Sequence, residues 1–303
     1  MKKVIVTGAS GFIGKHALSF LINKGYEVHG IYYSKIIDNI PNIIWHKANL
    51  LDPSETQALF DEIKPSHLLH LAWDVSQGFR DSSSNFDWLD ASIHILKVFE
   101  QNNGKRVVVA GTCFQYEFVD GVYSESKTPK NPFYTYGICK QKLNEFFNEY
   151  LKNTNLCGAW GYVFYPYGIG DSPNKLIPQA VQTLLNGAEF KLSSGDQIKD
   201  YIYIKDVAEA FVEILDSEIE GGINIGSGEG ITVKDITLKL AKLLGKENLV
   251  KIGAVLSYSN EPKEIIADIS KMKDILHWEP KYRIEQGLAE TVKFYTELYK
   301  VKD

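Results

Sequence analysis

The sequence has little cysteine and no long hydrophobic run. Its three cysteines, Cys113, Cys139 and Cys157, are odd in number and form no C-x-x-C pair, so we expect neither a disulfide framework nor a metal site. No segment reaches the roughly 18 apolar residues that a membrane span needs. The N-terminal apolar run Val4–Val6 is too short for the core of a signal peptide. We therefore predict a cytoplasmic protein without a membrane partner.

An excess of charge of one sign is also missing. The 303 residues include 33 Lys and Arg against 38 Asp and Glu, a formal net charge of −5, and both signs are scattered along the chain. Nucleic-acid-binding proteins present a basic face to the phosphates, so we expect no nucleic-acid partner. Any bound phosphate must be held locally, by a few lysines or by backbone amides.

The first half of the chain contains a regular alternation of strand and helix patterns. The expected strands are Val4–Thr7, Val28–Tyr32, His67–Ala72, Arg106–Ala110 and Cys157–Phe164, and the expected helices are Gly14–Lys24, Ser54–Ile63, Asp87–Gln101 and Tyr136–Leu151. This βαβ alternation predicts an α/β protein with a Rossmann-type, doubly wound parallel sheet that carries helices on both faces.

The pattern changes after about residue 165, where turn-rich stretches at 167–174, 193–197 and 221–230 separate shorter elements. A chain of this length is expected to form two domains. We predict a first domain over residues 1–165, which contains the parallel sheet, with a return of the chain to it at about 200–215. Residues 166–303 then form a second, smaller α/β domain that binds the substrate.

Residues 7–14 read T-G-A-S-G-F-I-G, directly after a strand and at the start of a helix. In a dinucleotide-binding turn, Gly8 allows the tight turn, Gly11 lets the backbone approach the pyrophosphate, and Gly14 permits close helix–strand packing. The helix N-terminus offers free amides and a positive dipole end to the phosphates. An ordinary glycine-rich turn is the alternative. The other residues of the predicted cofactor loop are Ser10, Phe12 and Ile13.

The end of the second predicted strand indicates which nicotinamide cofactor binds. An acidic residue there bonds the ribose hydroxyls of NAD, whereas basic or hydroxyl groups accommodate the 2′-phosphate of NADP. Here Tyr33, Ser34 and Lys35 follow the strand, and the first acid is Asp38. We therefore favour NADP(H) over NAD(H), with the first three residues as contacts. The alternative is that Lys35 is a solvated loop lysine.

The pattern Tyr-x-x-x-Lys occurs three times: Tyr123 with Lys127, Tyr136 with Lys140, and Tyr201 with Lys205. A lysine ammonium close to a phenol lowers the pKa of the phenol. Residues four apart lie close together on a helix, but about 13 Å apart on a strand. The first copy precedes a proline in a loop and the third lies in a strand-like run, so we select the second. Thr112, at the end of the fourth strand, is the third polar group that we expect there.

Together these residues resemble the extended short-chain dehydrogenase/reductase family of sugar-nucleotide epimerases, dehydratases and reductases, over nearly the whole chain. Four further segments resemble family motifs: T-C-F-Q-Y at 112–116, F-Y-P-Y-G at 164–168, G-D-Q-I-K-D-Y-I-Y at 195–203 and N-I-G-S-G at 224–228. The resemblance implies that Tyr136 is the general acid/base on a sugar oxygen, which Thr112 shares. It implies that Lys140 lowers the pKa of Tyr136 and bonds the nicotinamide ribose, while hydride passes between nicotinamide and sugar.

The resemblance also implies further contacts. Those to the cofactor are Asn49 and Leu50 at the adenine, Leu71 and Ala72 along the cofactor, and Phe164 at the nicotinamide. Those to a nucleotide-diphosphate sugar are Trp73, Tyr165, Lys175 and Lys199, with Lys263 as a weaker phosphate candidate. Each lysine has the alternative of a solvated surface position. A homodimer is implied through helices 87–101 and 136–151, with Ile95, Phe99 and Phe147 as candidates for an exposed face. The alternative is that these three side chains point into their own core.

Departures from the family pattern bear on the reaction. Cys113 and Phe114 stand where the dehydratases have an acidic pair, and Phe114 stands where the C3/C5 epimerases have a cysteine. We take Cys113 as a core cysteine. Segments 158–179 and 195–207 resemble nucleotide-sugar 4-ketoreductases of the CDP-abequose synthase type. We therefore predict an NADPH-dependent reductase of a nucleotide-linked 4-keto-6-deoxyhexose in bacterial polysaccharide biosynthesis. An NAD-dependent hexose 4-epimerase and a non-catalytic NADP(H) sensor are the alternatives, and the carrier (CDP, dTDP, GDP or UDP) stays open.

Overall fold

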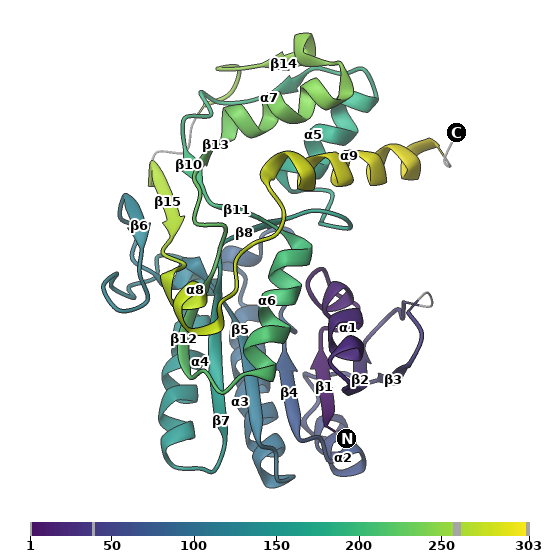
Figure 1. Cartoon of the computed structure of the whole chain (residues 1–303), viewed down its shortest axis with the longest axis vertical. Helices are drawn as coiled ribbons and strands as arrows, with labels where there is room; N and C mark the ends of the chain where they lie inside the picture. Colours follow the sequence, from purple (N-terminus) through teal and green to yellow (C-terminus); the bar gives the residue numbers. More distant parts are fainter. Residues whose placement is uncertain (1, 38–39, 257–261, 301–303) are drawn as a thin grey trace.

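A computed structural model describes residues 2–37, 40–256 and 262–300 (Figure 1). Asp38, the first acid after the second strand, lies outside these residues. The large sheet has seven parallel strands in the order β12-β7-β5-β4-β1-β2-β3. They are β1 (Lys3–Thr7), β2 (Glu27–Tyr32), β3 (Ile43–Lys47), β4 (His67–His70), β5 (Arg106–Thr112), β7 (Cys157–Val163) and β12 (Gly221–Ile225).

Helices cover both faces of this sheet. On one face α1 (Gly14–Asn23) packs against α6 (Ile204–Asp216); on the other, α2 (Pro53–Ile63), α3 (Ser84–Gln101) and α4 (Thr135–Lys152) pack side by side. The buried residues form two hydrophobic cores, and successive residues of a strand alternate between them. Val4 and Val6 of β1 lie in one core and Ile5 in the other. The strands therefore read as continuous apolar runs because both faces are buried. The predicted Rossmann-type fold is confirmed.

Smaller units, most of them from the second half of the chain, complete the fold. One sheet has the order β13-β10-β15-β6, and β11 pairs with β8 and β14 with β9. The strands are β6 (Gly121–Tyr123), β8 (Tyr165–Tyr167), β9 (Phe190–Lys191), β10 (Ile198–Lys199), β11 (Tyr201–Tyr203), β13 (Ile231–Thr232), β14 (Val250–Lys251) and β15 (Glu264–Ala267). The helices are α5 (Leu176–Leu185), α7 (Val233–Leu244), α8 (Ser270–Leu276) and α9 (Ile284–Lys300), with 3₁₀ turns η1 (Phe79–Asp81), η2 (Cys113–Gln115) and η3 (Glu247–Leu249). Helices α5, α7 and α9 pack together in the upper part of Figure 1.

Two strands of the large sheet were not predicted. The edge strand β3 is half-exposed along its length, so it lacks the apolar run that marks a buried strand. Strand β12 lies within the stretch 221–230, which the sequence pattern describes as turn-rich. It nevertheless pairs with β7 and places Ile223 and Ile225 in the core. The division of the chain into two domains stays a prediction. Among the described helices, none combines the length and apolar character that a bilayer span requires.

One prediction about the surface is wrong. Ile95, Phe99 and Phe147, offered as exposed side chains at a dimer interface, are fully buried in this chain's own core. Helices α3 and α4 pack against each other, and these three side chains fill the space between the helices and the sheet. A second copy therefore cannot contact them, although the predicted homodimer itself stays a prediction.

Candidate active site

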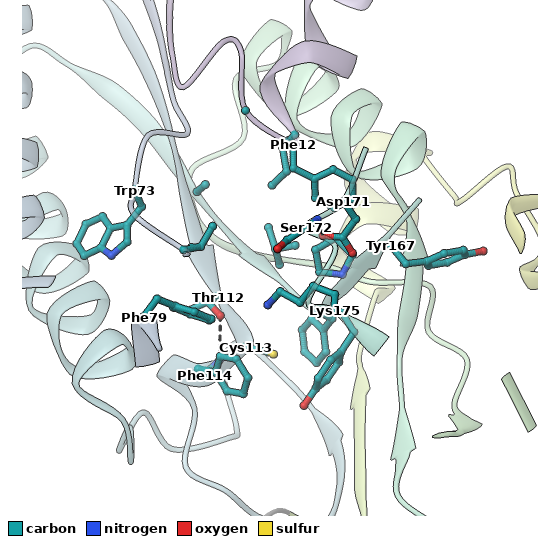
Figure 2. Close-up of a pocket in the computed structure, with 18 of the residues that line it drawn as sticks. Phe12, Trp73, Phe79, Thr112, Cys113, Phe114, Tyr167, Asp171, Ser172 and Lys175 are labelled. Carbon is teal, nitrogen blue, oxygen red and sulfur yellow. Dashed lines mark hydrogen bonds between the residues drawn. The ribbon is translucent and has the colours of Figure 1, made fainter. Parts of the chain in front are cut away.

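A cavity of about 700 Å³ opens where the carboxyl ends of the central parallel strands meet the second half of the chain (Figure 2). Its lining includes Gly8 after β1, Ala72 after β4, Thr112 at the end of β5 and Phe164 after β7. The facing wall comes from the segment 165–177, together with Lys199. Ligands of open parallel sheets bind at this edge, beyond the carboxyl ends of the strands.

The glycine loop packs so closely on neighbouring backbone that a side chain would not fit at Gly8 or Gly14. Gly8 has φ +68°, and a Cβ there would lie 2.9 Å from the backbone nitrogen of Ala72. A Cβ on Gly14 would lie 2.1 Å from the carbonyl oxygen of Gly8. Helix α1 has no side-chain cap at its N-terminus, and Ile13 and Gly14 at that end line the cavity, so the positive end of the helix dipole is available to an anion. These features fit a dinucleotide pyrophosphate.

A buried hydrogen-bond chain holds this loop against β4. The Thr7 hydroxyl oxygen accepts the amide hydrogens of Leu71 (3.1 Å) and Ala72 (3.3 Å). The Thr7 hydroxyl therefore donates to His70 Nδ1 (2.7 Å), and His70 Nε2 donates to the Ser92 hydroxyl (2.9 Å). Burial lowers the pKa of His70 to about 3, which keeps the ring neutral. Leu71 and Ala72 are thus fixed beside the glycine loop, in the cavity wall.

Thr112 ends β5 and caps η2. Its hydroxyl oxygen accepts the amide hydrogen of Phe114 (3.3 Å, dashed in Figure 2), and Gln115 Oε1 accepts the amide hydrogen of Thr112 (3.0 Å). This reciprocal capping fixes the hydroxyl in the cavity. The neighbouring Cys113 is buried, as predicted for a core cysteine, but it also touches the cavity. Burial raises the pKa of its thiol to about 12, so the thiol stays protonated.

Tyr136 and Lys140 lie one turn apart at the start of α4, and both face the cavity. Burial raises the pKa of Tyr136, and a hydrogen bond with Thr112 partly opposes that rise. Burial also lowers the pKa of Lys140 to about 7. The Lys140 ammonium donates to the carbonyl oxygen of Ala110 (2.8 Å) and lies 3.8 Å from the centre of the Trp73 ring.

The other two Tyr-x-x-x-Lys pairs are placed differently. The Tyr123 hydroxyl donates to the carbonyl oxygen of Val119 (2.6 Å), and Lys127, its partner in the pattern, is exposed in a turn. Tyr201 lines the cavity from β11, but Lys205 pairs with Glu290 (2.7 Å). The strand-like run predicted over this third pair is wrong at its end, because α6 already begins at residue 204. Only the second pair has both members in the cavity wall.

The predicted substrate contacts all line the cavity: Trp73, Thr112, Tyr165, Lys175 and Lys199. Lys175 extends across it, and its ammonium lies 4.9 Å from the centre of the Phe79 ring (Figure 2). Lys199 is almost completely buried on β10, with its ammonium 5.3 Å from the Tyr165 ring centre. Lys263 is absent from the cavity lining among the residues described.

The predicted cofactor contacts divide into two groups. Those in the cavity wall are Gly8, Gly11, Phe12, Ile13, Gly14, Leu71, Ala72, Tyr136, Lys140 and Phe164. Those outside it are Ser10, Tyr33, Ser34, Lys35, Asn49 and Leu50. Residues 33–35 follow β2 and residues 49–50 follow β3, and these two strands are neighbours in the sheet. The two segments therefore lie at one edge, where an adenosine would extend from the glycine loop, and their role stays a prediction.

Several cavity residues escaped prediction. Arg80 and Phe79 come from η1, and Arg80 stacks on the rings of Phe114 (4.9 Å) and Tyr134 (5.0 Å). Asp171 lies in the facing wall, and burial raises its pKa to about 6. These residues come from loops whose place depends on distant contacts, so no local pattern marks them. In the described part of the chain, no group of three or more His, Cys, Asp or Glu side chains is arranged to hold a metal ion.

Comparisons with known proteins agree with this geometry. The model of the "NAD dependent epimerase/dehydratase family" matches residues 4–226. CDP-abequose synthase of Salmonella typhimurium is 26% identical over 96% of this chain and 97% of its own. The UDP-glucose 4-epimerase of Rhizobium meliloti is 25% identical over 92% of each chain. In structure, the UDP-glucose 4-epimerase of Thermotoga maritima, solved with UDP-glucose, gives a TM-score of 0.89 at 23% identity and covers 98% of this chain and 99% of its own. The synthase and the epimerase of Rhizobium meliloti are therefore about equally similar to this chain in sequence.

Proposed function

The chain belongs to the NAD dependent epimerase/dehydratase family, a family of enzymes that act on nucleotide sugars, and from this premise we propose that it is an NADPH-dependent reductase of a nucleotide-linked 4-keto-6-deoxyhexose. The observation that carries the proposal is the placement of Thr112, Lys140 and Tyr136 together in the wall of one cavity beside the glycine loop, with Tyr136 as the proton donor. Burial raises the pKa of its phenol, so the group holds its proton in the neutral range. A reductase needs such a proton donor, because hydride addition leaves a negative charge on the sugar oxygen.

The roles of the residues follow from their positions. The Thr112 hydroxyl polarises the C4 carbonyl of the sugar, and Tyr136 donates its proton to the carbonyl oxygen. The Lys140 ammonium stabilises the phenolate that remains and bonds the nicotinamide ribose. NADPH, when bound on the glycine loop, supplies the hydride. The product is the 4-hydroxy sugar, and solvent returns the proton to Tyr136.

The facing wall carries two lysines that can bind the diphosphate of a nucleotide sugar. In this proposal Lys175 and Lys199 bind the diphosphate, and Tyr165 and Trp73 border the sugar. Phe114 and Cys113 offer no carboxylate where an elimination would need an acid and a base, so the site favours reduction over dehydration. The rings of Phe79 and Phe114 lie 5.0 and 6.5 Å from the Tyr136 ring, centre to centre. Such apolar side chains suit a 6-deoxy sugar, whose methyl group has no hydroxyl to satisfy.

Other predictions belong to the same proposal. The chain is divided into a cofactor domain over 1–165, with a return at about 200–215, and a substrate domain over 166–303. The protein is cytoplasmic and forms a homodimer. Light scattering at micromolar concentration tests the homodimer, and a monomeric mass would refute it.

The nucleotide carrier is a separate question. A thermal-shift panel of CDP, dTDP, GDP and UDP would identify the carrier, because the one that binds raises the melting temperature.

A hexose 4-epimerase is the second candidate, because it needs the same three residues and relatives of that type are similar over the same length. It differs in keeping NAD bound through its cycle. The test is the state of the purified enzyme. We expect protein free of bound cofactor that oxidises NADPH when the 4-keto sugar is added. Firmly bound NAD would favour the epimerase. Binding of NADPH without turnover of any sugar would favour a regulatory sensor.

A further inference from the structure

The catalytic lysine candidate sits on the face of an aromatic ring. Lys140 is 2% exposed, and its ammonium lies 3.8 Å from the centre of the Trp73 indole. A cation over a ring is attracted by the negative face of the π system, and tryptophan gives the strongest attraction. The effect grows when water is excluded, as it is at this depth. The contact therefore favours the charged form of Lys140 at a place where burial opposes it.

The indole ring is itself held in position. Trp73 Nε1 donates to Asn85 Oδ1 (2.8 Å). The Asn85 side chain is buried, and its Nδ2 donates to the carbonyl oxygens of Phe79 (2.7 Å) and Ser82 (2.8 Å). Because both amide hydrogens are used, the Asn85 oxygen must face the indole. The Trp73 ring also meets the Tyr136 ring edge to face, with 6.2 Å between their centres.

We propose that Trp73 is a positioning residue for Lys140: its ring, fixed by Asn85, keeps the ammonium charged and in place beside Tyr136. This role differs from the substrate contact predicted from the sequence. The inference rests on the proposed function only in assigning Lys140 to the nicotinamide ribose and to Tyr136.

Among the ionisable groups around Lys140 on the sheet side of the cavity, only Lys140 itself changes its charge in the neutral pH range. His70 of β4 has its pKa lowered to about 3, and Cys113 of η2 has its pKa raised to about 12, both by burial. Burial raises the pKa of Tyr136 as well. Arg80 of η1 keeps its charge at any pH used. Lys140, with a pKa lowered to about 7, is thus the group whose ionisation a change at Trp73 alters.

The facing wall contains the other ionisable groups of the cavity, which are Asp171, Lys175, Lys199, Tyr165, Tyr167 and Tyr201. They are the same in the parent enzyme and in a Trp73 variant, so a comparison of the two cancels their titration. Removal of the ring withdraws an interaction with the charged form only, and the pKa of Lys140 falls. The ammonium is then lost at a lower pH as the solution is made alkaline.

The experiment is the pH dependence of cofactor affinity, followed by nicotinamide fluorescence with NADPH and NADH in parallel. For Trp73→Leu we expect the alkaline loss of affinity to move about one pH unit toward acid. Trp73→Phe keeps an aromatic ring with a weaker attraction for the ammonium, so the pH at which affinity is lost should shift by less. The matched control is Trp88→Phe, since Trp88 packs beside Trp73 with 6.4 Å between ring centres. It should leave the profile unchanged.

A loss of affinity in Trp73→Leu that is equal at every pH would overturn the proposal, because it would show a ring that only fills space. If Trp73→Leu does not fold, Trp73→Phe and Asn85→Ala decide the matter. Asn85→Ala leaves the ring but frees it, so it should shift the profile in the same direction, and an unshifted profile in both variants contradicts the proposal. Binding is measured rather than turnover, so failure of the enzyme to reduce a 4-keto sugar would refute the proposed function and leave this result standing.

Discussion

The two walls of the cavity differ in origin and in charge. One wall consists of the glycine loop, Thr112 and the start of α4, all attached to the buried parallel sheet. Its reactive groups are almost completely enclosed, and burial opposes the charged forms of both Tyr136 and Lys140. The other wall consists of segments from the second half of the chain and carries Lys175, Lys199 and Asp171.

This difference separates reaction from recognition. The rigid wall fixes the distance between proton donor and glycine loop, which a hydride transfer requires. In the proposed function the charged wall binds the diphosphate, so sequence changes there would alter the substrate without disturbing the proton donor. Substitutions in the first wall should therefore change kcat, and substitutions in the second should change KM.

The largest effect is expected at Tyr136. Tyr136→Phe keeps the ring and its packing but removes the proton that the phenol donates. General acid catalysis contributes about 10²–10⁴-fold, so kcat should fall by that factor while the dissociation constant for NADPH hardly changes. Steady-state kinetics and a fluorescence titration measure the two quantities.

The matched controls for this change are the other tyrosines of the repeated pattern. Tyr123→Phe and Tyr201→Phe should leave turnover within a few-fold of the parent enzyme. For Tyr201, which lines the cavity, any change should appear in KM. Near-full activity in Tyr136→Phe, or its loss in either control, would show that the active site is assigned wrongly.

The charged wall is tested by neutralising its lysines. A charge-assisted hydrogen bond contributes about 1.5–3 kcal/mol, so Lys199→Met or Lys175→Gln should raise KM for the nucleotide sugar about tenfold to a hundredfold. The value of kcat should stay close to that of the parent. Lys263→Gln is the control and should change neither quantity. An effect confined to kcat would contradict the division between the walls.

The cofactor preference is a smaller effect at the outer edge of the first wall. With Ser34 and Lys35 after β2, the dissociation constant for NADPH should be about tenfold lower than for NADH. Lys35→Ala should weaken NADPH binding and leave NADH binding unchanged. Equal constants for the two cofactors in the parent enzyme, or tighter NADH, would refute the preference.

The smallest effect concerns stability. Burial raises the pKa of Asp171 to about 6, so the folded protein holds this proton more tightly than the unfolded chain, whose Asp pKa is about 3.9. The resulting stability is present below about pH 4 and is lost as pH rises through about 6. Asp171→Asn cannot ionise, and its side-chain oxygen still accepts the Ser172 amide hydrogen.

Thermal unfolding at two pH values measures this effect. At pH 8, Asp171→Asn should melt roughly 2 °C above the parent, and near pH 4 the two proteins should melt together. The exposed Asp196→Asn serves as the control and should melt like the parent at both values. A variant that is equally stabilised at both pH values would show that ionisation of Asp171 is not the cause.

Residues close in sequence were the ones that could be predicted. The glycine loop, the helix that begins at Tyr136 and the strand that ends at Thr112 each carry a local signal, either in turn chemistry or in hydrophobic period. Their common position at one edge of the sheet follows because the carboxyl ends of parallel strands share that edge. The fold class and the candidate Tyr136–Lys140 pair could therefore be derived before any coordinates.

Residues placed by long-range packing could not be predicted. Arg80 and Phe79 enter the cavity because Asn85 ties η1 to the start of α3, and no periodic pattern encodes that contact. Ile95 and Phe99 were misplaced because α3 is flanked by both the sheet and α4, which buries more of its surface than a one-faced helix would bury. Strand β12 was missed because a short run beginning with two glycines has no strand signal until a partner strand is known.

The fate of the nicotinamide hydrogen tests the central claim most directly. NADPH with deuterium at the transferable C4 position is incubated with the enzyme and a nucleotide-linked 4-keto-6-deoxyhexose, and the sugar is analysed by NMR. The proposed reaction places deuterium at C4 of the sugar, with one cofactor oxidised for each sugar reduced, and Tyr136→Phe slows this transfer. Interconversion of sugar C4 epimers on tightly bound NAD, with no NADPH oxidised and no deuterium in the sugar, would contradict it.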